Sequence, residues 1–125
     1  MLLFSYGSNG PDQLKERLER DVDGEPAHLP GWGRVFRGHS PRWGGAVATL
    51  EANSERVAYG WVCEVDEADL ETLDRYEGVA QGAYRRVMLS VLVRRGDHDE
   101  RARAVAYVRA RPPQQDPAAP PSNAY

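Results

Sequence analysis

A short polar loop separates an apolar segment from a helix start near the beginning of the chain, and its residue types suit anion binding. Residues 2–6 predict a buried strand, and Gly7 permits a turn that a Cβ atom would obstruct. Pro11 suits the first position of a helix, where its missing N–H group would have no partner. With Asn9 or Gly10 as the N-cap, backbone N–H groups would converge at the positive end of the helix dipole. The loop could therefore bind a carboxylate or a phosphate, or it could be a turn that binds no ligand.

A second candidate is the carboxylate of Glu77, which occupies a helix position where an apolar side chain is expected. Leu70 and Leu73 mark the buried stripe of this predicted helix, and the next positions on the stripe coincide at Glu77. Burial and the negative end of the helix dipole both disfavour the charged form, so we expect a raised pKa and a general acid/base. Alternatively, Glu77 is turned to solvent at a frayed helix end, or it is paired with Arg85 or Arg86.

The cysteine and the histidines predict no further site. Cys63 lies in residues 57–65, whose alternating pattern places Tyr59, Trp61 and Cys63 on the buried face of a strand. A catalytic thiol would need a base nearby, and the three histidines lie in loop-like sequence far along the chain. They are His28, His39 and His98, and they lack the short spacing of metal ligands. We therefore expect no metal, no cofactor, no disulfide and no cysteine nucleophile.

Composition predicts a cytoplasmic protein that folds as a single domain over residues 1–125. Hydrophobic residues make up 41% of the chain and charged residues 28%, which argues against general disorder. The net charge is −3 and basic residues are interspersed with acidic ones, so we expect no nucleic-acid partner. We also expect no membrane segment, because no run approaches the roughly 20 apolar residues of a spanning helix. The aromatic residues suit a core or an interface, which leaves a monomer and a homodimer open.

Around these candidates, hydrophobic periodicity predicts two helices and a larger number of strands. Asp66 is a good N-cap for the second helix, and Gly78 is suited to end it. Short connections and an excess of strands indicate an α+β fold with a mixed, barrel-like sheet. The predicted strands are 31–36, 43–50, 57–65, 84–94 and 101–109; the predicted helices are 12–20 and 67–76; loops are expected at 21–30, 37–42 and 96–99.

Taken in order, the motifs resemble the γ-glutamylcyclotransferase family over nearly the whole chain. The Tyr-Gly-Ser-Asn loop at residues 6–9 identifies by itself only the superfamily. The more specific signals are the Glu-Gly step at 77–78 and the segment Pro-Pro-Ser-Asn-Ala-Tyr at 120–125. The other matching segments are Trp-Gly-Gly-Ala-Val-Ala-Thr-Leu at 43–50, Gly-Trp-Val at 60–62, Leu-Asp-Arg-Tyr at 73–76 and Gly-Ala-Tyr at 82–84.

The resemblance implies a small mixed sheet closed around a cavity with flanking helices, and a cofactor-independent lyase or transferase of glutathione metabolism. Such an enzyme converts a γ-glutamyl amino acid or γ-glutamyl amine to 5-oxoproline and the free amine. The family's catalytic acid/base falls on Glu77. The implied substrate-binding residues are Tyr6, Gly7, Ser8, Asn9 and Gly10 in the loop, with Tyr84 and Tyr125 lining the pocket.

The implied chemistry agrees with the residues found independently. A γ-glutamyl group carries its own nucleophile, the α-amine, which can close a five-membered ring on the γ-carbonyl. The enzyme must supply a bent conformation, a base for the amine proton and a donor for the departing amine. Glu77 would take the proton and pass it on, while the N–H groups of residues 7–10 would hold the α-carboxylate or the γ-carbonyl oxygen.

Two departures from the family pattern affect the expected pocket. Gly10 stands where the family usually has a larger apolar residue, and members of the family continue into a further helix beyond the position of Tyr125. Without that helix we expect one side of the cavity to be more open, which would admit larger substrates or impair activity. The C-terminal tail, residues 111–125, has the proline content of a disordered or polyproline segment, but we expect it to pack on the domain.

Two other functions fit the same residues. A related enzyme would release a γ-glutamyl cap from a biosynthetic amine or from a γ-glutamyl-ε-lysine linkage. A catalytically silent module would use the loop for a carboxylate ligand, or the proline-rich tail for a partner. A Glu77 side chain that is exposed, or far from the loop amides, would favour the silent module.

Overall fold

The structure is a computed structural model that describes residues 1–6, 10–40 and 45–110. Within these ranges the side chains of residues 37–40 and 45–47 are not described. The expected loop at 7–9 and the expected packing of the tail at 111–125 therefore lie outside the described residues.

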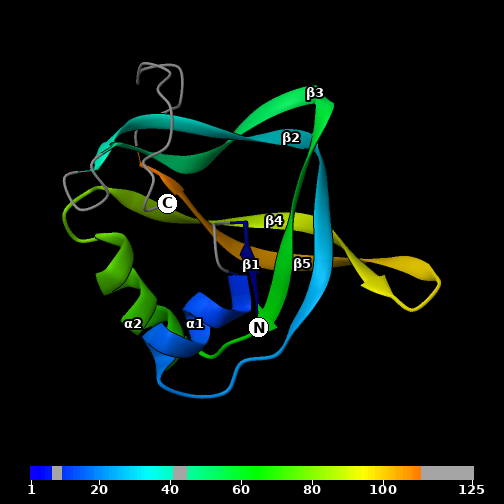
Figure 1. Ribbon diagram of the computed structural model, residues 1–125, viewed down its shortest axis with the longest axis horizontal. Coiled ribbons are helices and arrows are strands. Elements are labelled where there is room, and N and C mark those ends of the chain that lie inside the picture. Colours follow the sequence, from blue (N-terminus) through cyan, green and yellow to red (C-terminus); the bar gives the residue numbers. More distant parts are fainter. Residues whose placement is uncertain (7–9, 41–44, 111–125) are drawn as a thin grey trace.

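Five strands close into a barrel in the order β1, β3, β2, β4 and β5 (Figure 1). All neighbouring strands are antiparallel except β1 and β5, which are parallel, so the sheet is mixed as predicted. Both helices lie against one side of the barrel (Figure 1). The elements are β1 Leu2–Ser5, α1 Gly10–Leu18, β2 Gly24–Ser40, β3 Gly45–Glu64, α2 Glu67–Glu77, β4 Tyr84–Arg95 and β5 His98–Arg109. The predicted α+β class with a barrel-like sheet is confirmed.

The prediction of a loop at 21–30 is wrong, because β2 already begins at Gly24. β2 contains Pro26 and Pro30, which cannot donate a hydrogen bond to a neighbouring strand. In the barrel, β2 pairs along most of its length with β3 but with β4 only at Ala27 and His28. Both prolines lie outside this short second pairing, and Pro30 also lies next to a register shift, so the missing N–H groups are tolerated.

The predicted inward face of residues 57–65 is also partly wrong. Tyr59 and Trp61 are 72% and 40% exposed, whereas Ala58 and Val62, on the opposite face of the strand, are buried inside the barrel. At Gly60 the inner face has no room for a side chain, because β1 approaches closely there. A Cβ atom at Gly60 would collide with the carbonyl oxygen of Ser5 in β1. The pattern of large and small side chains therefore misled the assignment of faces.

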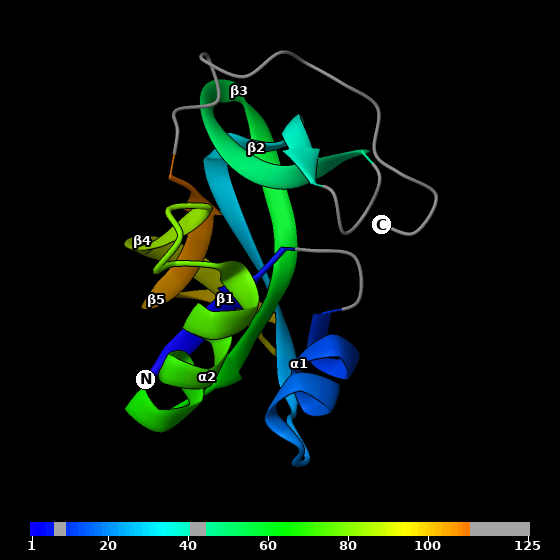
Figure 2. The same ribbon diagram turned by 90° about the vertical axis from the view of Figure 1, so that its left-hand side faces the viewer.

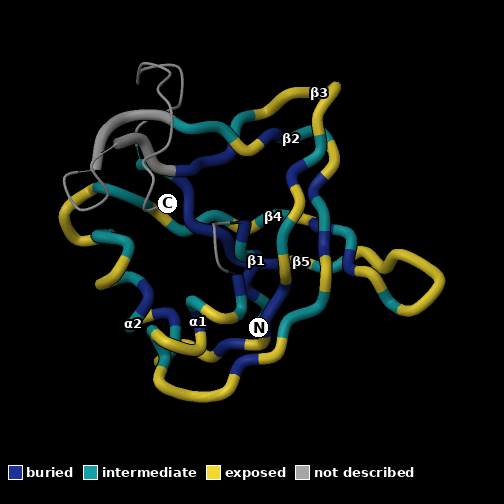
Figure 3. Tube along the Cα trace, in the orientation of Figure 1, coloured by how far each residue is buried: buried dark blue, intermediate teal, exposed yellow. Residues whose placement is uncertain are grey.

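Among the described residues, two apolar clusters hold the fold together, and Figure 3 colours buried residues dark blue. The first fills the barrel interior, and the second lies between the barrel wall and the two helices. Cys63 belongs to the second cluster, and burial raises the pKa of its thiol to about 11, so the thiol stays protonated at neutral pH. The second cluster consists of Leu3, Leu14, Val22, Cys63, Val65, Leu70, Leu73, Val105 and Tyr107.

The boundaries of α2 follow the predicted caps. The Asp66 side chain accepts a hydrogen bond from the backbone N–H of Asp69, and the Asp69 side chain accepts one from the backbone of Asp66. Gly78 ends the helix in the left-handed conformation, with φ of 67°. These local signals fix where the helix stops, and they place Glu77 in its last position.

Candidate active site

Glu77 lies on the stripe of α2 that carries the buried Leu70 and Leu73, and only 23% of its side chain is exposed. Its Oε1 atom lies 3.0 Å from Nη1 of Arg17, a residue of α1. Glu77 is therefore not a solvent-facing glutamate, and Arg86, one of the expected alternative partners, pairs with Asp74 and Glu67 instead.

Arg17 makes two contacts with residues of α2. Its Cζ atom lies 5.1 Å from the centre of the Tyr76 ring, in addition to the ion pair with Glu77. Only 14% of the Arg17 side chain is exposed. An opposite charge at this distance stabilises the ionised form of the carboxyl group. This effect opposes the effects of burial and of the helix dipole.

The two helices run antiparallel, and this direction determines what lies near Glu77. Arg20, just after α1, binds Asp69 near the start of α2, with Nη2 2.6 Å from Oδ2. Arg17, one turn earlier, binds the last residue of α2. The start of α1 at Gly10 therefore points toward the same end of the helix pair as Glu77 (Figure 2). Residues 7–9 precede this helix start directly.

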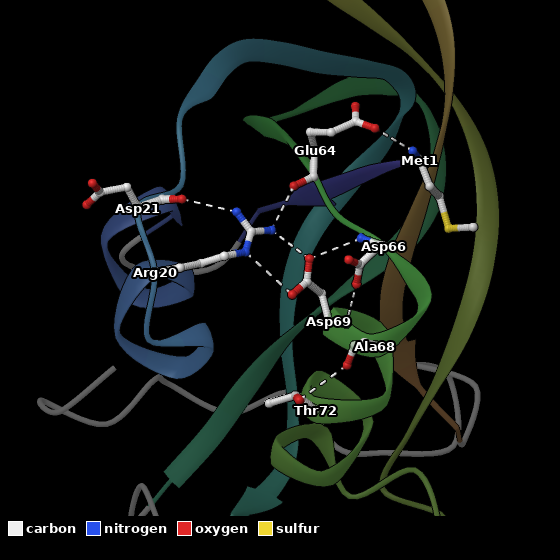
Figure 4. A network of polar contacts seen from close by, with 8 residues as sticks. All are labelled: Met1, Arg20, Asp21, Glu64, Asp66, Ala68, Asp69 and Thr72. Carbon is white, nitrogen blue, oxygen red and sulfur yellow. Dashed lines mark hydrogen bonds and ion pairs between the residues drawn. The ribbon is translucent and has the colours of Figure 1, made fainter.

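A polar network fixes the start of α2 against the turn that follows α1 (Figure 4). The Arg20 guanidinium donates to the Asp69 carboxylate and to the backbone carbonyls of Asp21 and Glu64. The hydrogen bond from Arg20 lowers the pKa of Asp69. This network orients the two helices at the end opposite to Glu77.

Tyr6, a predicted substrate-binding residue, is buried, and its hydroxyl group donates to the backbone carbonyl of Tyr107 in β5. The Tyr107 hydroxyl in turn donates to Oδ1 of Asp74 in α2, at 2.7 Å. Asp74 accepts two hydrogen bonds from Arg86 in β4, at 2.8 and 2.6 Å. This chain of contacts connects the residue before the loop to the helix that carries Glu77.

The network around Asp74 predicts an acid dependence of stability. Hydrogen bonds from Arg86 and then Tyr107 lower the pKa of Asp74 in the folded protein below its unfolded value of about 3.9. The folded state therefore binds fewer protons, and the stabilisation is present above about pH 4 and lost as the pH falls through the folded pKa. Urea unfolding from pH 7 to pH 2 should show a smaller loss of stability in Asp74→Asn than in wild type. The matched change at the exposed Asp23 should leave the pH dependence unchanged.

Tyr84 and Gly10 complete the described part of the predicted substrate-binding set. The Tyr84 hydroxyl donates to the carbonyl of Ala48 at 2.9 Å. Gly10 is buried with φ of 51°, and a Cβ atom there would lie 2.8 Å from Cδ1 of Trp61. The Trp61 ring thus takes up space that a larger residue at position 10 would need. The remaining predicted residues, Gly7, Ser8, Asn9 and Tyr125, lie outside the described residues.

Arg17 is a candidate site residue that the sequence argument missed. Leu14 and Leu18 form the apolar stripe of α1, and Arg17 lies three residues after Leu14, at the edge of this stripe. The sequence contains one signal for this pair. Arg17 lies at the edge of the apolar stripe of α1, and Glu77, of opposite charge, lies on the apolar stripe of α2. Their pairing depended on the direction of the helix packing, which the sequence pattern does not encode.

No three His, Cys, Asp or Glu side chains among residues 1–6, 10–40 and 45–110 are grouped so that they could hold a metal ion. Neither of the helices in these ranges is long and apolar enough to cross a membrane.

Comparison with solved structures defines the class of the fold as γ-glutamyl cyclotransferase-like. An uncharacterised human protein matches with 25% identity and a TM-score of 0.82, over 98% of this chain and 71% of the human one. A gamma-glutamyl cyclotransferase structure matches with 25% identity and a TM-score of 0.80, over 98% of this chain and 72% of that one. A yeast gamma-glutamyl cyclotransferase specific to glutathione shares the fold at 14% identity, with a TM-score of 0.62 over 86% of this chain and 68% of the yeast one.

The sequence comparison gives the family. The model of the family described as gamma-glutamyl cyclotransferase, AIG2-like, matches residues 3–125, and the chain belongs to this family. No curated protein sequence matches the chain significantly.

Proposed function

We propose that the protein is a γ-glutamyl cyclotransferase that converts a γ-glutamyl amino acid or γ-glutamyl amine to 5-oxoproline and the free amine. Family membership supports the reaction class, and the gamma-glutamyl cyclotransferase structure supports it at 25% identity. The observation that carries the proposal is the position of Glu77. Its carboxylate is largely buried at the end of α2, on the same end of the helix pair as the start of α1.

The reaction needs one proton acceptor that later becomes a proton donor. The substrate's α-nitrogen attacks the γ-carbonyl carbon, and Glu77 takes the proton that this nitrogen loses. The tetrahedral intermediate then collapses with cleavage of the bond between the γ-carbon and the leaving nitrogen. Glu77 returns the proton to that nitrogen, so the products are 5-oxoproline and the free amine. No water, cofactor or protein nucleophile enters the balance.

The loop at residues 7–10 would supply the binding half of this site. Its backbone N–H groups precede and begin α1, where the helix dipole favours a negative charge. They would hold either the substrate's α-carboxylate or the γ-carbonyl oxygen as charge develops in the transition state. Tyr84 and Tyr125 would line the pocket for the rest of the substrate, as the family resemblance implies.

A panel of substrates tests the proposal. It contains a γ-glutamyl dipeptide, a γ-glutamyl alkylamine and γ-glutamyl-ε-lysine, together with an N-acetylated γ-glutamyl dipeptide whose α-amine cannot attack. We expect 5-oxoproline from at least one of the first three compounds and none from the blocked compound, and the preferred compound identifies the leaving amine. Binding of these compounds without release of 5-oxoproline would instead indicate the silent binding module and contradict the proposal.

A further inference from the structure

We propose that Arg17 is a positioning residue for Glu77, which fixes one oxygen of its carboxylate and keeps the group ionised and ready to accept the substrate's amine proton. This inference rests on the proposed function for its chemical consequence. Its physical basis is the contact between the two helices, which does not depend on a substrate.

The Arg17 side chain has less freedom to move than an arginine in an exposed ion pair. The guanidinium contacts both the ring of Tyr76 and the carboxylate of Glu77, and only 14% of the side chain is exposed. The Nη1 atom contacts Oε1 of Glu77, which limits rotation of the carboxylate. The contact therefore orients the Glu77 carboxylate relative to α1.

Several other charged groups on the packed elements bind partners other than Glu77. On α2, Asp74 lies one turn before Glu77 and is paired with Arg86 of β4, which also binds Glu67. Tyr107 of β5 donates to Asp74. On α1, Lys15 pairs with Asp21 and is 59% exposed, while Arg75 of α2 is exposed and donates to a threonine hydroxyl. Arg17 contacts the Glu77 carboxylate directly, whereas these other cations bind different partners.

This pairing suits both halves of the proton transfer. Before the reaction, the guanidinium offsets the effects of burial and of the helix C-terminus, which favour a neutral carboxyl group. After Glu77 takes the proton, the same cation favours its release, so the proton returns readily to the leaving nitrogen. Arg17 gains and loses no proton, because arginine stays charged throughout this pH range.

The direct test is the titration of the Glu77 carboxyl group by ¹³C NMR in the full chain. The Glu77 resonance is assigned by its disappearance in Glu77→Gln. We expect Arg17→Gln to raise the Glu77 pKa by about one unit and Arg17→Lys to raise it less, because lysine keeps the charge. The control Arg20→Gln removes a cation from the same pair of helices at the opposite end (Figure 4), and it should leave the Glu77 titration unchanged.

Kinetics gives a second readout. In Arg17→Gln the acid limb of the pH profile of kcat/KM should move to higher pH by the same amount as the Glu77 pKa. We also expect kcat to fall roughly 10-fold, with little change in KM. Arg17→Lys should recover part of kcat. An unchanged Glu77 titration in both Arg17 variants, or equal losses in Arg17→Gln and Arg20→Gln, would overturn the inference. If wild type makes no 5-oxoproline the proposed function fails, and the NMR titration still decides whether Arg17 controls Glu77.

Discussion

Replacing Glu77 with glutamine is expected to reduce 5-oxoproline formation by at least roughly 100-fold, the lower range for loss of a general acid/base. Glutamine has nearly the same shape, and its amide oxygen can still accept a hydrogen bond from Arg17. It cannot accept the α-amine proton at neutral pH. The loss should therefore appear mainly in kcat, which is measured by following 5-oxoproline release at saturating substrate.

The matched control for this substitution is Glu71→Gln, on the exposed face of the same helix. It changes the net charge by the same amount and leaves the contact between Glu77 and Arg17 in place. We expect turnover within twofold of wild type. Equal turnover by Glu77→Gln and wild type would show that another group moves the proton.

The second large effect is expected from Gly60→Ala, which should lower the free energy of unfolding by about 3 kcal/mol. A Cβ atom at this position would overlap the carbonyl oxygen of Ser5 and would also lie 3.0 Å from the Phe4 ring. Because the first of these atoms belongs to the backbone, rotation of a side chain cannot relieve the collision. Strands β1 and β3 would have to separate, and β1 leads directly into the loop that is proposed to bind substrate.

Urea unfolding of Gly60→Ala measures this loss, and Gly33→Ala provides the comparison. The atoms nearest to a Cβ atom at Gly33 belong to the guanidinium of Arg56, which is the end of a flexible side chain. We expect Gly33→Ala to stay within about 1 kcal/mol of wild type. In Gly60→Ala, turnover should also fall at least about 10-fold under conditions where the protein remains folded. Similar stability of the two variants would contradict the close approach of β1 to β3.

The predictable parts of the fold are those with signals contained in neighbouring residues. The α2 helix follows from an N-cap at Asp66, a leucine stripe and a left-handed Gly78, and its bounds differ little from those predicted. The final hairpin follows from two apolar runs around Gly96, which has φ of 64°. In both cases, the residues that determine the conformation lie close together in the chain.

The parts that sequence patterns missed depend on long-range packing. Pro26 and Pro30 are tolerated in β2 because they lie outside its short pairing with β4. The length of this pairing is set by the arrangement of the strands in the barrel. Tyr59 and Trp61 lie outside, whereas the inner face of β3 has no room for a side chain at Gly60, where β1 approaches closely. Neither arrangement can be predicted from the residue types of β2 and β3 alone.

The candidate site shows the same division. The position of Glu77 on a buried stripe follows from helical periodicity, and the structure places this side chain largely out of solvent. The pair with Arg17 joins residues 60 positions apart in the sequence, and it follows from the antiparallel packing of the two helices. The roles of Glu77 and of the loop at residues 7–10 in catalysis stay predictions.

Incubation of the protein with a γ-glutamyl amine in H₂¹⁸O tests the central claim most directly, because it separates ring closure from hydrolysis. If the substrate's own α-amine is the nucleophile, mass spectrometry will find 5-oxoproline without ¹⁸O, formed in an amount equal to the free amine. Release of the amine together with glutamate that carries one ¹⁸O atom would show attack by water and would contradict the proposed function.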